Sequence, residues 1–202
     1  SLTDNRNKWN QYMAIPPIAV AVARMGWNWQ WNQLMNGLAP ADKLGNYCRK
    51  TSQKQTAPVL TQENLINRKQ KELPVLIIGR SCPWAHRTWL LHALRKLDSN
   101  LNLLIAKPDY EAGLWKIDPS WMGCKSLLEI YKLCDVNLTQ RATVPALIDP
   151  QRSKNNKIKL LGNESAQLVE VLNVWPTQVN APDFYPPELQ REIDLWQTLL
   201  QD

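Results

Sequence analysis

The chain has 202 residues, enough for one ordinary domain with additions, and its 44% hydrophobic and 21% charged residues are typical of a soluble globular protein. The net charge of +6 favours anionic partners, but the Lys and Arg residues are scattered along the chain, so we predict no nucleic-acid partner. Four cysteines without a CxxC pair and only two histidines predict free thiols and no metal site, which favours a reducing, cytoplasmic location.

Residues 1–72 form a predicted N-terminal extension that differs in composition from the rest of the chain. One short helix is predicted near residues 18–25, followed by loops. Trp27, Trp29 and Trp31 alternate, which fits a short extended piece or an arm that wraps the surface. We interpret the extension as packed on the domain, with a ligand or partner site as the alternative. The apolar stretch MAIPPIAVAVARM is too short to span a bilayer and lacks the frame of a signal peptide, so we predict no membrane span.

A strand, a helix and a second strand are predicted after residue 74. The apolar run VLIIG at 75–79 predicts a buried strand, PWAHRTWLLHALRKL a helix, and LNLLIA at 101–106 a second buried strand. Together they predict a βαβ unit with a right-handed connection. A loop that carries Trp115 and Trp121 is predicted next.

The second half of the predicted α/β domain, which spans 73–176, completes the order βαβαββα. It holds a helix at 125–136, two strands in VPALID and KIKLLG around a polar turn, and a last helix with Asn163 as N-cap. Residues 177–202 then hold a linker and the amphipathic helix ELQREIDLWQTLLQ. Its apolar residues need burial that one helix can hardly receive: Leu189, Ile193, Trp196, Leu199 and Leu200.

Cys82 stands where the first predicted strand gives way to the helix. Pro83 suits the first helical turn, so Cys82 lies at or next to the N-cap. Free amides and the positive end of the helix dipole favour the thiolate there, and Arg80 and Arg87 lie close in sequence. Because the thiolate is the nucleophile of thiol–disulfide exchange, we predict that Cys82 is catalytic. The alternative is a small, buried, apolar cysteine.

Position 85 predicts the type of thiol chemistry. It holds Ala85 instead of a second cysteine, so a mixed disulfide on Cys82 has no resolving thiol in the same motif. We therefore expect monothiol chemistry, in which an external thiol releases the adduct. Cys124 and Cys134 could approach Cys82 in space, but nothing in the sequence requires it.

Two further motifs fit a peptide ligand. Val144 and Pro145 precede a strand, and a cis bond between them would expose backbone groups of Val144 to a peptide; an ordinary edge-strand proline is the alternative. Glu164 and Ser165 begin the last helix, where they suit the ammonium and carboxylate of an amino-acid end such as a γ-glutamyl group. Plain helix capping is the alternative for this pair.

The motif CPWAHRT, followed in order by VP and NES, resembles the glutathione transferase superfamily, and within it the Xi-type glutathionyl-hydroquinone reductases. The resemblance covers about residues 74–200. It implies a thioredoxin-like domain, glutathione as co-substrate and aromatic glutathione conjugates as substrates. It also implies that Trp115 and Arg141 contact glutathione, and that Cys82 removes glutathione from glutathionyl-hydroquinones through a mixed disulfide.

Proteins of this type continue into an all-helical domain, and the helix at 188–201 resembles the first helix of that domain. We therefore expect either a fragment or a chain that a separate protein chain completes. A homodimer is the other protein partner that we consider. Two other functions remain open. One is a non-catalytic module that docks in a larger assembly through its Trp-rich arm and its open helical face. The other is a monothiol enzyme that removes glutathione from protein disulfides.

Overall fold

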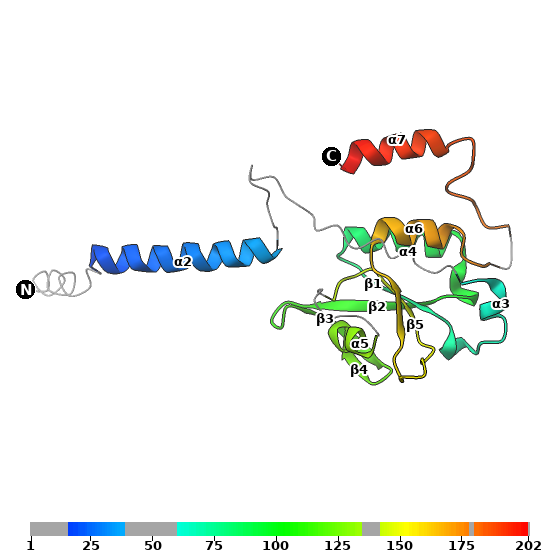
Figure 1. The fold of residues 1–202 in the computed structure, drawn as a ribbon, viewed down its shortest axis with the longest axis horizontal. Helices are drawn as coiled ribbons and strands as arrows, with labels where there is room; N and C mark the ends of the chain where they lie inside the picture. Colours follow the sequence, from blue (N-terminus) through cyan, green and yellow to red (C-terminus); the bar gives the residue numbers. More distant parts are fainter. Residues whose placement is uncertain (1–15, 39–59, 135–141, 178–179, 202) are drawn as a thin grey trace, which may run out of the picture. The chain divides into compact units, whose positions relative to one another are not determined.

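The structure is a computed structural model that describes residues 16–38, 60–134, 142–177 and 180–201 (Figure 1). The chain divides into two compact units, Ser1–Gln53 and Lys54–Asp202, and each is described by itself. The helices and strands of the second unit are α3 (Gln62–Leu65), η1 (Gln70–Glu72), β1 (Val75–Gly79), α4 (Pro83–Leu94), η2 (Leu97–Ser99), β2 (Asn102–Asp109), β3 (Leu114–Trp121), β4 (Cys124–Ser126), α5 (Leu127–Leu133), β5 (Ala146–Asp149), β6 (Lys159–Gly162), α6 (Ser165–Asn173) and α7 (Gln190–Gln201).

The described residues of the first unit form helix α2 (Pro17–Leu38), which is longer than the helix predicted near residues 18–25. Trp27, Trp29 and Trp31 lie within this helix, so the prediction of an extended piece was wrong. The helix begins at Pro17, and no later proline interrupts it before Leu38. The alternation of the three tryptophans therefore does not indicate a strand. The described side chains of α2 are exposed.

Within the described residues, one six-stranded sheet has the order β4-β3-β2-β1-β5-β6. The central strand β1 is buried at all five positions, pairs in parallel with β2 and pairs antiparallel with β5. Helices α4 and α6 contact each other on one side of the sheet, and α5 lies on the other side (Figure 1). The predicted βαβ unit and the later strands and helices are thereby confirmed.

The stretch predicted as a loop with Trp115 and Trp121 forms the hairpin strand β3, which pairs with β2 and with the short β4. The prediction was wrong because β3 has little strand signal. Ile117 is its only buried residue and Pro119 interrupts its pattern. Glycine supports the turns that flank β3, since Gly113 and Gly123 have φ angles of +64° and +80°.

The core of the second unit lies between the sheet and its helices, and it also takes in residues before β1. Trp175 is fully buried after α6, and its indole N–H donates to the Asn100 carbonyl at 3.3 Å. Leu65 of α3 is buried as well. Arg68 forms a bidentate ion pair with Asp149 at the end of β5, with donor–acceptor distances of 2.7 and 3.2 Å. The segment from Leu60 onward therefore packs with the sheet.

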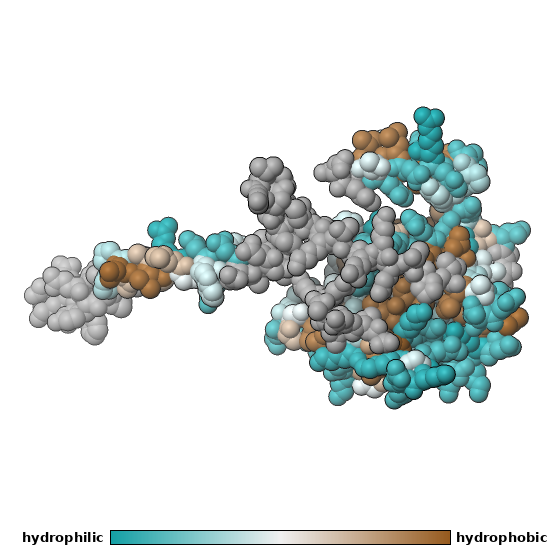
Figure 2. All heavy atoms as spheres, in the orientation of Figure 1, coloured by the Kyte–Doolittle hydropathy of each residue, from teal (hydrophilic) through white to brown (hydrophobic). Residues whose placement is uncertain are grey.

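Helix α7 presents apolar side chains to solvent, as the sequence predicted. Leu189, which precedes the helix, and Trp196 and Leu199 within it are each about half exposed. Ile193 is half-buried, and the side chain of Leu200 lies outside the described part. Figure 2 shows hydrophobic residues at the surface of this helix. No helix in the described part of the chain is long and apolar enough to cross a membrane.

Candidate thiol site

Cys82 is the N-cap of α4, and Pro83 is the first residue of the helix, as predicted. The turn that leads into the helix is closed by a hydrogen bond from the Cys82 amide to the Gly79 carbonyl at 3.0 Å. The side chain makes no capping hydrogen bond, so the amides of α4 do not hold the sulfur in this structure. Instead, Sγ lies 3.6 Å from the Val144 carbonyl oxygen, within reach of a weak S–H···O bond.

The Val144–Pro145 peptide bond is cis, and both residues are buried just before β5. The sheet explains why these residues reach Cys82. Because β1 and β5 are antiparallel, with Ile77 opposite Ala146, the end of β1 lies beside the start of β5. Cys82 and the Val144–Pro145 pair therefore meet at the same end of these two strands, although 62 positions separate Cys82 from Val144 in the sequence.

Tyr131 of α5 anchors the segment before Val144, and sequence reasoning missed it as a site residue. Its hydroxyl donates to the Thr143 carbonyl at 3.0 Å and accepts from the Asn163 side chain at 3.3 Å. Burial raises the pKa of Tyr131, so the hydroxyl keeps its proton. Asn163 is committed to this contact, and the N-cap of α6 is Glu164, so the prediction of Asn163 as N-cap was wrong.

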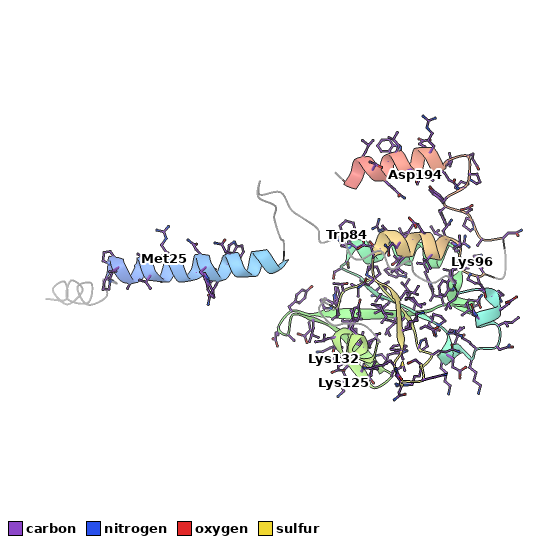
Figure 3. The ribbon with its side chains drawn as sticks, in the orientation of Figure 1. Met25, Trp84, Lys96, Lys125, Lys132 and Asp194 are labelled. Carbon is purple, nitrogen blue, oxygen red and sulfur yellow. The ribbon has the colours of Figure 1, made fainter. Side chains whose placement is uncertain are left out.

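Ser165 begins α6 and is almost fully buried. Its hydroxyl oxygen accepts a 2.5 Å hydrogen bond from Nη2 of Arg87, which lies one turn beyond the start of α4. The guanidinium carbon of Arg87 lies 5.4 Å from the ring centroid of Trp84, within range of a cation–π interaction. Figure 3 labels Trp84 at α4. Helices α4 and α6 are thus joined near their N-terminal ends.

Trp115 of β3 reaches across the sheet to the end of β1. A Cβ atom added to Gly79 would lie 2.5 Å from two carbons of the Trp115 ring, so this ring rests directly on the Gly79 backbone. Gly79 also closes the turn to Cys82, which places Trp115 next to that turn. Trp121 stands at the opposite end of β3. Arg141, the remaining predicted contact, lies outside the described residues.

Cys124 and Cys134 differ from Cys82 in their surroundings. Both are buried and free, whereas Cys82 is half-buried. Burial raises the pKa of Cys124, and it raises the pKa of Cys134 to about 12. The Cys134 thiol lies 3.4 Å from the Ile130 carbonyl oxygen, within its own helix. Neither thiol is therefore suited to ionise near neutral pH.

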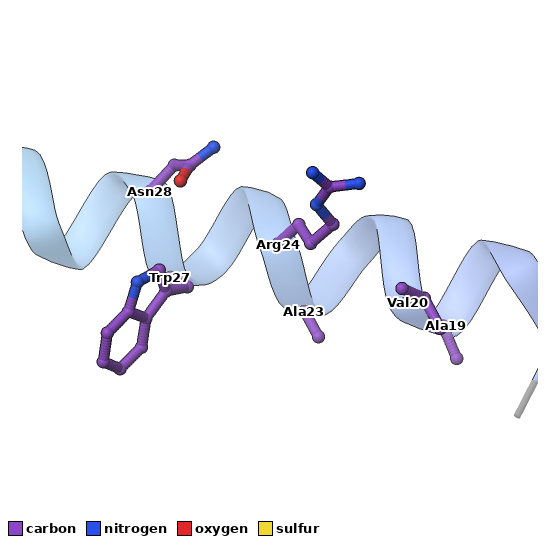
Figure 4. A pocket seen from close by; sticks show the side chains of 6 residues that line it. All are labelled: Ala19, Val20, Ala23, Arg24, Trp27 and Asn28. Atoms are coloured by element: carbon purple, nitrogen blue, oxygen red, sulfur yellow. The ribbon is translucent and has the colours of Figure 1, made fainter.

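A shallow depression on α2 does not form a second site. Ala19, Ala23 and Trp27 line it from one helix, together with Val20, Arg24 and Asn28 (Figure 4). Figure 4 shows no opposing wall, since every labelled side chain comes from the same helix. Ligand sites enclose most of their ligand, and this surface encloses nothing.

Comparisons with known proteins show which family this arrangement resembles. Residues 81–174 match the family model described as "Glutathione S-transferase, N-terminal domain". This segment belongs to the glutathione S-transferase N-terminal domain family. The resemblance that the motifs predicted and the thioredoxin-like α/β fold are thereby confirmed.

Two curated relatives of this glutathione transferase domain are glutathionyl-hydroquinone reductases. The chain is 31% identical over 135 residues to YqjG of Escherichia coli, and 30% identical over 128 residues to PcpF of Sphingobium chlorophenolicum. These alignments cover 62% and 59% of this chain but only 40% and 39% of the relatives. The chain therefore spans about two fifths of the length of the curated relatives it matches.

Two solved structures are similar in fold. The glutathione-bound structure of YqjG matches with 30% identity and a TM-score of 0.51, over 64% of this chain and 44% of that chain. The Xi glutathione transferase of Saccharomyces cerevisiae, in complex with glutathione, matches with 21% identity and a TM-score of 0.59. That match covers 78% of this chain and 56% of the yeast chain, and it supports the fold alone.

Proposed function

We propose that this chain carries the glutathione-binding, thiol-bearing part of a cysteine-dependent glutathione transferase. The enzyme would remove glutathione from glutathionyl-hydroquinone substrates. The observation that carries the proposal is the position of the Cys82 sulfur. It is half-buried at the start of α4 and 3.6 Å from the Val144 carbonyl, beside backbone groups with which a peptide-like thiol compound would pair. The relatives named glutathionyl-hydroquinone reductases support the choice of substrate.

The first step is attack by the Cys82 thiolate on the sulfur of the conjugate. An S–S bond forms between Cys82 and glutathione, and the bond between sulfur and the aromatic carbon breaks. That carbon keeps the electron pair and takes a proton, and the hydroquinone leaves. In the second step, the thiolate of another glutathione attacks the glutathione sulfur of the mixed disulfide. Oxidised glutathione leaves, and the Cys82 thiolate is restored.

Glutathione would lie along the segment from Val144 to the start of α6. The backbone of Val144, beside Pro145, would pair with the cysteinyl part of the peptide. Glu164 would bind the γ-glutamyl ammonium and Ser165 the neighbouring carboxylate. Arg141 would bind a second carboxylate, and Trp115 would pack on the peptide. The net charge of +6 agrees with an anionic tripeptide.

Among the described residues no other cysteine is suited to resolve a mixed disulfide on Cys82, and Cys48 lies outside them. Ala85 offers no second sulfur in the motif. The buried Cys124 and Cys134, with their raised pKa values, are poor resolving thiols. A second glutathione is therefore the expected reductant, and the reaction belongs in a reducing compartment such as the cytoplasm.

Formation of the mixed disulfide tests the proposal directly. We expect the protein, incubated with oxidised glutathione near neutral pH, to gain the mass of one glutathionyl group in intact-mass spectrometry. The Cys82→Ser variant should gain none, because the nucleophile is absent. Cys124→Ser and Cys134→Ser serve as matched controls and should retain the adduct. A folded wild-type protein without an adduct would contradict the proposal.

Exposed apolar residues favour a second candidate function, a non-catalytic module that docks in a larger assembly. Trp27, Trp29 and Trp31 are exposed on α2, and Trp196 and Leu199 are exposed on α7. A folded protein that forms no adduct on Cys82 would favour this alternative. If the adduct forms, the rates of turnover of glutathionyl-hydroquinones and of glutathionylated peptides should be compared. Faster turnover of the former favours the reductase, and faster turnover of the latter favours an enzyme that acts on protein disulfides.

A further inference from the structure

Arg87 belongs to the motif that carries Cys82, yet the chemistry proposed above gives it no task. Trp84 and Arg87 are three residues apart in α4, so their side chains lie on the same side of the helix. The guanidinium carbon lies 5.4 Å from the Trp84 ring centroid. The planar guanidinium is thereby kept near a ring face, which restricts its direction.

From this position the side chain of Arg87 extends from α4 to α6. Its Nη2 donates to the Ser165 hydroxyl oxygen at 2.5 Å, between residues 78 positions apart. A serine hydroxyl has one proton to donate and two lone pairs that accept. Because Arg87 uses one lone pair, the hydroxyl proton must point elsewhere and is available as a donor. Ser165 stands in the first turn of α6, where the free amides also favour an anion.

We infer that Arg87 is a positioning residue that orients Ser165 as a hydrogen-bond donor to the γ-glutamyl carboxylate of glutathione. The inference rests on the proposed function, since it assumes that glutathione binds at this site. Cys82 caps the helix that carries Arg87, so α4 links the position of the reacting sulfur to the position of the carboxylate. A purely structural alternative is that the Arg87–Ser165 bond only joins α4 to α6.

Binding of glutathione and of one analogue separates the two roles. The analogue, N-(4-aminobutanoyl)-cysteinylglycine, lacks only the γ-glutamyl carboxylate. We expect Arg87→Met to raise the Kd of reduced glutathione, measured by calorimetry, by about tenfold or more. The Kd of the analogue should change by less than about twofold. An equal loss for both ligands, or no loss for glutathione, would overturn the inference.

A double-mutant cycle tests whether Arg87 acts through Ser165. In a Ser165→Ala background, Arg87→Met should change the glutathione Kd by less than about twofold, because no hydroxyl remains to be oriented. Additive losses would overturn the indirect role. If Arg87→Met does not fold, as judged by circular dichroism, Arg87→Lys replaces it in both comparisons, since an ammonium cannot reproduce the planar fork.

A charge-matched control and the wild type complete the design. Arg152→Gln removes a positive charge from the exposed turn after β5, at the opposite end of that strand from Val144. The glutathione Kd of this variant should stay within about twofold of the wild-type value. A wild-type protein that binds no glutathione overturns the proposed function together with the inference. An equal loss of affinity for glutathione and for the analogue in Arg87→Met would overturn the inference but not the proposed function.

Discussion

A methyl group at position 79 would overlap the Trp115 ring, since an added Cβ lies 2.5 Å from its Cη2 and Cζ3 atoms. We expect Gly79→Ala to displace the ring from the end of β1 and to lower the free energy of unfolding by about 1–3 kcal/mol in urea titrations. Gly26→Ala is the matched control, because nothing lies within 4 Å of the added atom in α2. Equal stability of Gly79→Ala and the wild type would show that the ring does not rest on this glycine.

The buried thiol of Cys134 makes stability depend on pH. Burial raises the pKa of Cys134 from 9.0 to about 12 in the folded chain, whereas the unfolded chain ionises near the ordinary value. Above about pH 9 the unfolded state therefore binds fewer protons than the folded state, so the free energy of unfolding falls as pH rises. Urea titrations at about pH 8 and pH 10.5 should show this fall, and Cys134→Ala should reduce it. A fall of equal size in the variant would contradict the assignment to Cys134.

At the scale of elements, sequence patterns predicted β1, β2, β5 and β6 and missed β3 and the short β4. Strand β1 is continuous and apolar because both of its faces are covered, so it could be recognised. Strand β3 faces solvent over most of its length, and its single buried residue leaves no alternating pattern. The first part of α2 was predicted as a short helix, but the part with Trp27, Trp29 and Trp31 was predicted as an extended piece or an arm because these residues alternate. The exposure of α2 on all described sides leaves no helical period in its sequence.

The hydrogen bonds of Tyr131 tie three elements together, and their removal should be measurable. Tyr131→Phe leaves the Thr143 carbonyl and the Asn163 amide without this partner, and both hydrogen bonds are partly buried. We expect the free energy of unfolding to fall by about 1–3 kcal/mol, measured in urea, and adduct formation on Cys82 to slow.

Tyr110→Phe is the matched control, because Tyr110 is 85% exposed. Its stability should stay within about 0.5 kcal/mol of the wild type. If the two variants proved equally stable, the Tyr131 hydroxyl would not anchor the segment before Val144.

At the scale of the whole molecule, local patterns located the candidate site but not the contacts that assemble it. Cys82, Glu164 and Ser165 could be found because each stands at a helix start, and helix starts have characteristic residues at and next to the N-cap. The bond from Arg87 to Ser165 and the packing of Trp115 on Gly79 depend on how distant segments meet in the folded chain. No short stretch of sequence contains that information.

The ion pair between Arg68 and Asp149 affects more of the fold than these two residues. Both side chains are screened from solvent, with relative exposures of 7% and 10%. A shortened protein that starts at β1 would lose the guanidinium and keep a lone carboxylate inside, and an uncompensated interior charge is costly. That carboxylate ends the strand whose other end leads back to Val144 and the sulfur of Cys82. Arg68, in the described stretch before β1, therefore stabilises the strand that leads to the candidate thiol site.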